Sequence, residues 1–251
     1  MRSLLFSVWF YLLFALVSLI YTPSAGLVVI AGRLFSSSRV TMRRFRTAIR
    51  WYGRILIWGL PRPFLNVRYS DKAAVSPTPC IVVCNHRSSS DPFLMACLDF
   101  EVVQVVNTWP FRIPFLGWFA RWAGYLSVNQ MPYDEFYRRC VRLIREGVSI
   151  VAFPEGTRSG SRRLGQFRSA MFRIALEEKV PIVPLCIVGN ENRPPRGSFR
   201  LHPGRIVIHK LPACEPRDYR RMNAFVLKNR IRALIGEETK RMDASYDTQN
   251  L

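Results

Sequence analysis

The residues best suited to chemistry in this sequence are a histidine and an aspartate that follow a short apolar run. Residues 81–84 have the pattern of a buried strand, His86 comes just after them, and Asp91 lies five residues further on. A strand end can fix an imidazole in place, and a carboxylate within reach can orient its ring. The other histidines, His202 and His209, have no carboxylate close behind them. We therefore predict that His86 is a general base and Asp91 its partner.

The same two residues also have a simpler explanation. Asp91 followed by Pro92 is a typical helix start, with the carboxylate as N-cap and proline in the first turn. His86 could be a histidine whose hydrogen bonds are satisfied at a strand end. The two roles can coexist, because a capping carboxylate can still reach an imidazole. The spacing alone is weak evidence, and a second motif is needed.

A second candidate site follows the strand predicted at Ser149 to Phe153. The next residues are Pro154-Glu155-Gly156-Thr157-Arg158-Ser159-Gly160, at the strand end where α/β sheets place ligand-binding loops. Gly156 allows a close approach to the backbone, Thr157 offers a hydroxyl, and Arg158 can bind a phosphate through two hydrogen bonds. The loop is neither a P-loop nor a nucleophile elbow, so NTPase and serine-hydrolase chemistry lack their usual marks. The loop predicts an anionic ligand.

The positive charge of the chain is concentrated toward its beginning. The net charge is +20, and residues 1–70 contain ten arginines but no aspartate or glutamate. Nucleic acid and an anionic membrane are the two partners that such a surface suits. The arginines adjoin an apolar segment, which favours anionic membrane lipids, and no nucleic-acid partner is expected.

The six cysteines predict neither a disulfide framework nor a metal site. They are scattered, mostly within apolar runs, and form no Cys-x-x-Cys pair and no cluster with histidine. We expect reduced thiols in the core of a protein from a reducing compartment, with no bound metal.

The first sixty residues are predicted to be membrane-anchoring helices. Ser3 to Gly32 contains no charged residue, and Leu4 to Tyr21 would reach about 27 Å as a helix, close to the roughly 30 Å hydrocarbon core. Pro23 and Gly26 are expected to interrupt it. A cleaved signal peptide is the alternative, but the apolar region is long for one and lacks a good cleavage site. We therefore expect a retained anchor.

A basic amphipathic helix is predicted at Ser38 to Leu60. Arginines at 43, 46, 50 and 54 share one face, and apolar residues at 45, 49, 52 and 56 share another. Such a helix can lie on anionic lipid, or it can be a surface helix packed on the core. The lack of acidic residues favours the membrane, and the arginine excess places the following domain on the cytoplasmic side.

Beyond Pro61, strand-like and helix-like runs alternate over residues 61–242. This alternation predicts an α/β fold, with a mostly parallel sheet covered by helices, and a polar, disordered tail over 243–251. The strands are expected at Phe64 to Tyr69, Cys80 to Cys84, Val102 to Val106, Tyr125 to Val128, Ser149 to Phe153, Pro181 to Val188 and Ile206 to His209. The helices are expected at Pro92 to Phe100, Tyr133 to Glu146, Phe167 to Lys179 and Asp218 to Arg241.

Together the two motifs make this chain resemble the glycerolipid acyltransferase family, which includes lysophosphatidic acid acyltransferases. Asn85-His86 through Asp91 matches the family's His-x-x-x-x-Asp motif. Phe153 to Ser159 matches its Phe-Pro-Glu-Gly-Thr-Arg-Ser block, and Val180 to Leu185 is similar to its proline-containing strand. The resemblance covers about residues 60–210, and the two motifs occur in the family's order.

The resemblance implies an O-acyltransferase and assigns roles to its residues. His86 would take the proton of an acceptor hydroxyl, Asp91 would orient the imidazole, and the oxygen would attack an acyl thioester directly. Glu155, Gly156, Thr157 and Arg158 would bind the acceptor, lysophosphatidic acid. The reaction would need no metal or resident cofactor, only acyl-CoA or acyl-carrier protein as co-substrate. The expected location is the cytoplasmic face of a bacterial inner membrane.

Two departures from the family pattern leave the acceptor open. Gln130 stands where the family often has an arginine that helps to hold glycerol phosphate, and Phe167-Arg168-Ser169-Ala170 replaces its Phe-Lys-x-Gly. The alternative is therefore the same chemistry on another lysophospholipid or an amino-acid-containing lipid. A non-catalytic basic protein that binds membranes or nucleic acid is a third possibility, but it does not explain the two motifs.

Overall fold

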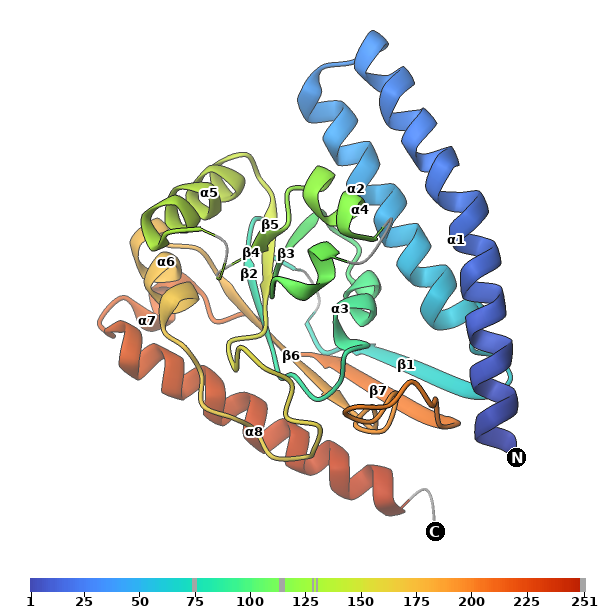
Figure 1. The fold of residues 1–251 in the computed structure, drawn as a ribbon. Helices are drawn as coiled ribbons and strands as arrows, with labels where there is room; N and C mark the ends of the chain where they lie inside the picture. Colours follow the sequence, from blue (N-terminus) through green and yellow to red (C-terminus); the bar gives the residue numbers. More distant parts are fainter. Residues whose placement is uncertain (74–75, 113–115, 128, 130, 249–251) are drawn as a thin grey trace.

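The core of the protein is a seven-stranded sheet, shown in Figure 1. The computed structural model describes residues 1–73, 76–112, 116–127, 129 and 131–248. The strands are β1 Leu65–Asp71, β2 Ile81–Cys84, β3 Val102–Val106, β4 Leu126–Ser127, β5 Ser149–Ala152, β6 Ile182–Val188 and β7 Gly204–Lys210, in the spatial order β1-β7-β6-β2-β5-β3-β4. Each overlaps a predicted strand; Val128, at the end of one prediction, lies outside the described residues.

The sheet is mostly parallel, as predicted. Strands β6 and β7 pair antiparallel, and every other neighbouring pair in the sheet is parallel. The central strands β2, β5 and β6 therefore end at the same edge of the sheet. The residues after them, which include His86, Phe153 and Asn190, must come together there.

Both faces of the sheet are buried, which explains the continuous apolar runs of its central strands. Alternate residues of β2 point to opposite sides, so that Ile81 and Val83 join one hydrophobic cluster while Val82 and Cys84 join the other. The first cluster includes residues of α5, α6 and α8, and the second includes residues of α1 and α3. The sheet thus forms the middle of three layers (Figure 1).

The helices follow the predicted order but differ in their bounds. They are α1 Arg2–Phe35, α2 Ser38–Arg54, α3 Asp91–Leu94, α4 Leu116–Trp122, α5 Tyr133–Arg145, α6 Ala170–Glu178, α7 Pro216–Tyr219 and α8 Ala224–Thr248. The helix predicted at Pro92 to Phe100 is shorter, because α3 gives way to a 3-10 turn at Met95–Cys97. The helix predicted at Asp218 to Arg241 is divided, and Asn223 caps the second part by accepting a hydrogen bond from the Val226 N–H at 2.9 Å.

The prediction of a disordered tail is wrong for residues 243–248. Helix α8 continues through Met242 to Thr248, and its last turns carry Asp243 and Asp247, which pair with arginines of the catalytic region. The polar composition suggested disorder, but these acidic side chains form ion pairs with Arg87 and Arg162 that fix the last turns of α8 to the rest of the protein. Residues 249–251 lie outside the described residues.

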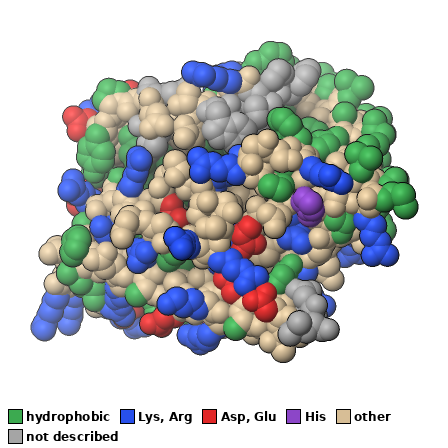
Figure 2. Space-filling view, turned by 60° about the horizontal axis from the view of Figure 1, so that its bottom comes forward, with side chains coloured by type: hydrophobic (Ala, Val, Ile, Leu, Met, Phe, Trp, Pro, Cys, Tyr) green, Lys and Arg blue, Asp and Glu red, His purple; other side chains and the backbone are tan. Residues whose placement is uncertain are grey.

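Helix α1 is one continuous helix, so the predicted interruption at Pro23 and Gly26 is wrong. The most apolar 18-residue stretch within Arg2–Gly32 has a mean hydropathy of 2.3, and 11% of that stretch is buried. Among the described residues, this is the helix long and apolar enough to cross a membrane. Figure 2 shows hydrophobic side chains gathered on the side of the molecule that α1 occupies.

Helix α2 packs back on α1 and on the α/β domain, and its basic face is only partly free. Tyr21 of α1 donates a hydrogen bond to the Ala48 carbonyl at 2.8 Å. Arg46 pairs with Glu101 at 2.7 Å, and Phe45 is buried. The packing on the core that sequence offered as an alternative is therefore present, and fewer arginines than predicted are available to lipid.

Candidate active site

The catalytic loop begins where β2 ends, and Asn85 fixes the transition. Its side chain accepts a hydrogen bond from the Ile187 N–H at 2.8 Å and donates one to the Ile187 carbonyl at 2.9 Å. These bonds replace ladder contacts and tie the loop to β6. Sequence analysis gave Asn85 no role, although a polar residue directly after an apolar strand was the available signal.

His86 and Asp91 meet as predicted. The imidazole Nδ1 lies 2.7 Å from Asp91 Oδ2, and the carboxylate is completely buried. The same oxygen accepts the N–H groups of Arg87 at 2.8 Å and Ser88 at 2.9 Å. Asp91 thus turns back to the loop that precedes it and makes no cap to α3, whose N-cap residue is Ser90. The capping alternative is therefore wrong, although Asp91 does begin the helix.

This geometry leaves one imidazole nitrogen of His86 available for chemistry. An ionised Asp91 can only accept, so Nδ1 carries the proton and Nε2 presents a lone pair. The His86 side chain is 17% exposed and its ring packs on Phe153, with 4.6 Å between the ring centroids. A partly exposed imidazole with an oriented base nitrogen is suited to remove a proton from a hydroxyl group.

Glu155 joins the two motifs. One carboxylate oxygen accepts the backbone N–H of His86 at 2.7 Å, and the other accepts that of Gly165 at 2.7 Å. Burial raises the pKa of Glu155, while these two N–H groups act in the opposite direction. The carboxylate therefore holds the loop against the catalytic histidine. Its predicted contact with an acceptor stays a prediction.

The loop after β5 borders a cavity of about 460 Å³. Gly156 has φ +75°, a left-handed conformation that favours glycine, and its backbone lies directly beneath the Arg168 guanidinium. The cavity is lined by Glu155, Thr157, Ser159, Arg163, Leu164, Gly165, Gln166, Phe167 and Arg168. Arg158 is not part of this lining, so its predicted phosphate contact is untested, and Arg163 and Arg168 supply the cations of the wall.

A second cavity, of about 130 Å³, lies between α2, α3 and β3. It reaches the loop at Ser89 and α3 at Pro92 and Phe93, and most of its wall is apolar or aromatic. The remaining lining comes from α1, α2, α4, β3 and the residues around them: Tyr21, Thr22, Arg46, Ile49, Arg50, Tyr52, Gly53, Met95, Ala96, Val102, Gln104, Val106, Phe119, Ala120 and Tyr125. This shape and composition suit a hydrocarbon chain.

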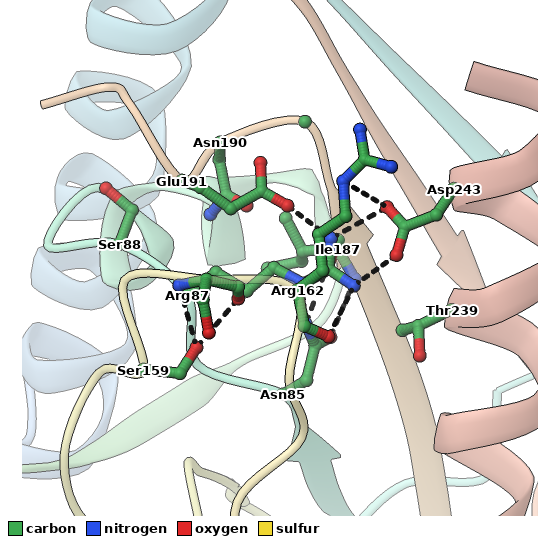
Figure 3. A network of polar contacts seen from close by, with 12 residues as sticks. Asn85, Arg87, Ser88, Ser159, Arg162, Ile187, Asn190, Glu191, Thr239 and Asp243 are labelled. Atoms are coloured by element: carbon green, nitrogen blue, oxygen red, sulfur yellow. Dashed lines mark hydrogen bonds and ion pairs between the residues drawn. The ribbon is translucent and has the colours of Figure 1, made fainter. Parts of the chain in front are cut away.

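A buried arginine connects the catalytic loop to the end of α8. Arg87 makes two hydrogen bonds to Asp243, at 2.7 and 2.9 Å, and one to Glu191 at 2.5 Å (Figure 3). Burial alone would lower the pKa of Arg87, but its bonds to these carboxylates raise it. No sequence signal linked residues so far apart, because their proximity depends on how α8 docks.

The remaining predictions about the site concern its cysteines, a metal ion and Gln130. All six cysteines are buried and free, and burial raises their pKa values, as expected for core thiols. Within the described part of the chain, no group of three or more His, Cys, Asp or Glu side chains could hold a metal ion. Gln130 lies outside the described residues.

Comparison with known proteins finds a family match for the part of the chain that contains this site. The acyltransferase family matches residues 66–188. The chain is similar to a chloroplastic 1-acyl-sn-glycerol-3-phosphate acyltransferase of Brassica napus, with 37% identity over 54% of this chain and 41% of the relative. It is similar to the corresponding protein of Pseudomonas aeruginosa, with 22% identity over 68% of each chain. The chain spans less than half the length of the Brassica relative.

The fold is also that of a solved structure. The 1-acyl-sn-glycerophosphate acyltransferase PlsC from Thermotoga maritima superposes with a TM-score of 0.80, and the match covers 97% of both chains at 21% identity. The two proteins thus share a fold, and in this chain the His86–Asp91 pair lies at the carboxyl edge of the sheet. Residues 66–188 of the chain match the acyltransferase family, and the relatives that share this region are named acyltransferases, which disfavours the non-catalytic alternative.

Proposed function

We propose that this enzyme transfers a fatty acyl group from a thioester to the free hydroxyl of lysophosphatidic acid, giving phosphatidic acid. The observation that carries the proposal is the His86–Asp91 contact. An apolar cavity reaches the same loop at Ser89, and Glu155, which accepts the His86 N–H, borders a cavity with two arginines in its wall. A lysophospholipid has both kinds of surface. The relatives from Brassica napus and Pseudomonas aeruginosa are named 1-acyl-sn-glycerol-3-phosphate acyltransferases, which agrees with this acceptor.

The reaction needs one positioned base. Nε2 of His86 takes the proton of the acceptor hydroxyl as its oxygen attacks the thioester carbonyl. A C–O bond forms, and the resulting oxyanion then expels the thiolate as the C–S bond breaks. The imidazolium returns its proton to the thiolate, so the enzyme ends as it began. Asp91 holds the ring and stabilises the transient imidazolium.

The parts of the substrates follow the chemistry of the two cavities. An acyl chain suits the apolar cavity beside α3, and the phosphate suits the basic cavity, with Arg163 and Arg168 in its wall. Arg158 is proposed as a further phosphate ligand, together with the loop at Gly156 and Thr157. The donor is acyl-CoA or acyl-carrier protein.

The setting of the reaction is proposed to be the cytoplasmic face of a membrane, in a bacterium the inner membrane. Helix α1 supports this because its exposed face is apolar: Leu12, Leu16 and Leu19 are 67%, 52% and 71% exposed. Such a face is stable in contact with lipid, whereas its exposure to water would cost free energy. The acceptor and the product would then remain in the bilayer.

An acceptor panel tests the function. Purified protein in mixed micelles receives a labelled acyl-CoA and, in separate reactions, lysophosphatidic acid, other lysophospholipids and an amino-acid-containing lysolipid. We expect the highest kcat/KM with lysophosphatidic acid. His86→Ala should lower kcat by a factor of about 10²–10⁴, while the matched variant His202→Ala should keep the wild-type kcat. A clear preference for another acceptor would refute the assignment.

A further inference from the structure

We propose that Asn190 is a positioning residue for acyl transfer, a role that rests on the function proposed above. Asn190 follows β6 at the edge of the sheet where His86 follows the parallel strand β2. Its side-chain Nδ2 donates a hydrogen bond to Oδ1 of Asp91. The other oxygen, Oδ2, is already held by His86, Arg87 and Ser88. Asn190 thus fixes the half of the carboxylate that the catalytic loop leaves free.

The burial of Asn190 indicates that its side chain is retained for the hydrogen bond to Asp91. The residue is completely buried, and among the described residues Oδ1 of its amide has no hydrogen-bond partner. A buried polar atom without a partner is costly and calls for an explanation. Reversing the amide would place its oxygen against an oxygen of Asp91. The observed orientation therefore suits an ionised Asp91.

The loop that carries Asn190 is held on both sides. Gly189 has φ +81°, and a Cβ there would lie 2.5 Å from the Arg205 carbonyl oxygen. Glu191 pairs with Arg87 at 2.5 Å, so the residue after Asn190 is anchored to the residue after His86 (Figure 3). A rigid loop is what a positioning hydrogen bond requires.

Removing the Asn190 amide should change the protonation of the catalytic pair. The hydrogen bond stabilises the ionised carboxylate, so its loss raises the proton affinity of the His86–Asp91 pair. The other charged or titratable groups that face the pair are Glu155 beyond β5, the buried Cys84 thiol of β2, and Arg87. These groups remain in the variant. The acid limb of the pH–rate profile should therefore move to higher pH.

Two substitutions at Asn190 and one control separate positioning from stability. Asn190→Leu keeps the approximate volume and removes the donor. Asn190→Asp keeps the shape of the side chain; when protonated it can donate an O–H to Asp91, and when ionised it repels the Asp91 carboxylate. The control is Ser149→Ala, because Ser149 is equally buried and accepts the Cys80 N–H at 3.1 Å, at the end of β5 remote from the catalytic loop.

We expect Asn190→Leu to lower kcat about tenfold, a part of what a well-placed base contributes, with little change in either KM. Its acid limb should move up by about one pH unit, because a hydrogen bond to a charged group is lost. Asn190→Asp should be the more active variant at acidic pH and should lose activity as its shared proton dissociates. Ser149→Ala should lower the melting temperature and leave the profile unchanged.

The proposal is overturned if Asn190→Leu keeps the wild-type kcat and acid limb, or if Asn190→Asp has a profile parallel to that of the wild type. It is also overturned if the loss in Asn190→Leu disappears once rates are corrected for the folded fraction. A measurement without substrate separates this result from failure of the proposed function. Diethyl pyrocarbonate modifies neutral imidazole, so its rate at His86, mapped by mass spectrometry against pH, should show the same shift even if lysophosphatidic acid is not the acceptor.

Discussion

Replacing Asp91 by asparagine should damage catalysis far more than its small change in shape suggests. The wild-type carboxylate accepts four hydrogen bonds, one at Oδ1 from Asn190 and three at Oδ2 from His86, Arg87 and Ser88. An amide has one oxygen and one NH₂ group. If its oxygen faces the three donors, its NH₂ opposes the NH₂ of Asn190. In the reverse orientation, the NH₂ opposes the three donors.

The size of the effect follows from these two orientations. Either one leaves at least one buried donor unpaired, which costs about 1–3 kcal/mol of folding free energy. With the NH₂ toward His86, the ring must accept at Nδ1 and carry its proton on Nε2, where it cannot act as a base. The corresponding change in a serine-protease triad lowers kcat about 10⁴-fold. We expect a loss of about 10²–10⁴ in kcat for Asp91→Asn.

The measurement is the initial rate of acyl transfer in mixed micelles, together with urea unfolding of the same preparations. The matched control is Asp99→Asn, because Asp99 is an exposed aspartate eight residues away. The control should retain both rate and stability. A folded Asp91→Asn enzyme with a rate within about threefold of the wild type, well inside the loss expected from a displaced base, would refute the assignment of Asp91 as the orienting residue.

Three further predictions concern α8, α1 and the pH dependence of stability. Asp243→Asn should lower the free energy of unfolding by about 1–3 kcal/mol, because the buried Arg87 loses one of its two carboxylate partners and keeps Glu191. Asp247→Asn breaks an exposed pair and should unfold like the wild type in the same urea titration. The double change Leu12→Lys, Leu19→Lys should reduce binding to anionic vesicles in a flotation assay; unchanged flotation would contradict an anchoring role for α1. Burial alone would raise the pKa of Glu238, but its hydrogen bonds to Lys72 and His209 outweigh burial and lower the pKa. The ionised Glu238 therefore stabilises the folded protein fully above about pH 4.3, the ordinary pKa of a glutamate. This contribution to the free energy of unfolding is lost as the pH falls through the lowered pKa. Thermal melts of Glu238→Gln should therefore show a weaker fall in stability below that pH than the wild type shows.

The sequence predicted the sheet well because its central strands are buried on both faces. Such strands appear as uninterrupted apolar runs, and the helices between them set their mostly parallel direction. Helix ends were harder to predict, since they depend on tertiary contacts. Pro23 lies inside α1 without ending the helix. Helix α8 extends to Thr248 because Asp243 and Asp247 find arginine partners only in the folded protein.

The candidate site was predictable where its residues are close in sequence. His86 and Asp91 belong to one loop, and their contact needed only the right turn. Asn190 lies about a hundred residues away from Asp91, so its role depends on β6 lying beside β2. The same parallel pairing could have suggested it, because a polar residue after each of two neighbouring strands converges at one edge. The distribution of ligand contacts between Arg158, Arg163 and Arg168 depends on side-chain directions that sequence does not encode locally.

Strand β1 lies at the edge of the sheet, where β7 is its neighbour among the described strands. This position has a consequence for synthesis of the chain. Leu65 pairs with Gly204, which follows it by 139 residues. At about 5–20 residues per second, β1 waits roughly 7–28 s for its partner while the rest of the sheet is made. Its alternating polar residues, among them Asn66, Arg68 and Ser70, oppose pairing with another chain during that interval. The polar face of β1 therefore protects the nascent protein from aggregation at a stage when the finished fold does not yet exist.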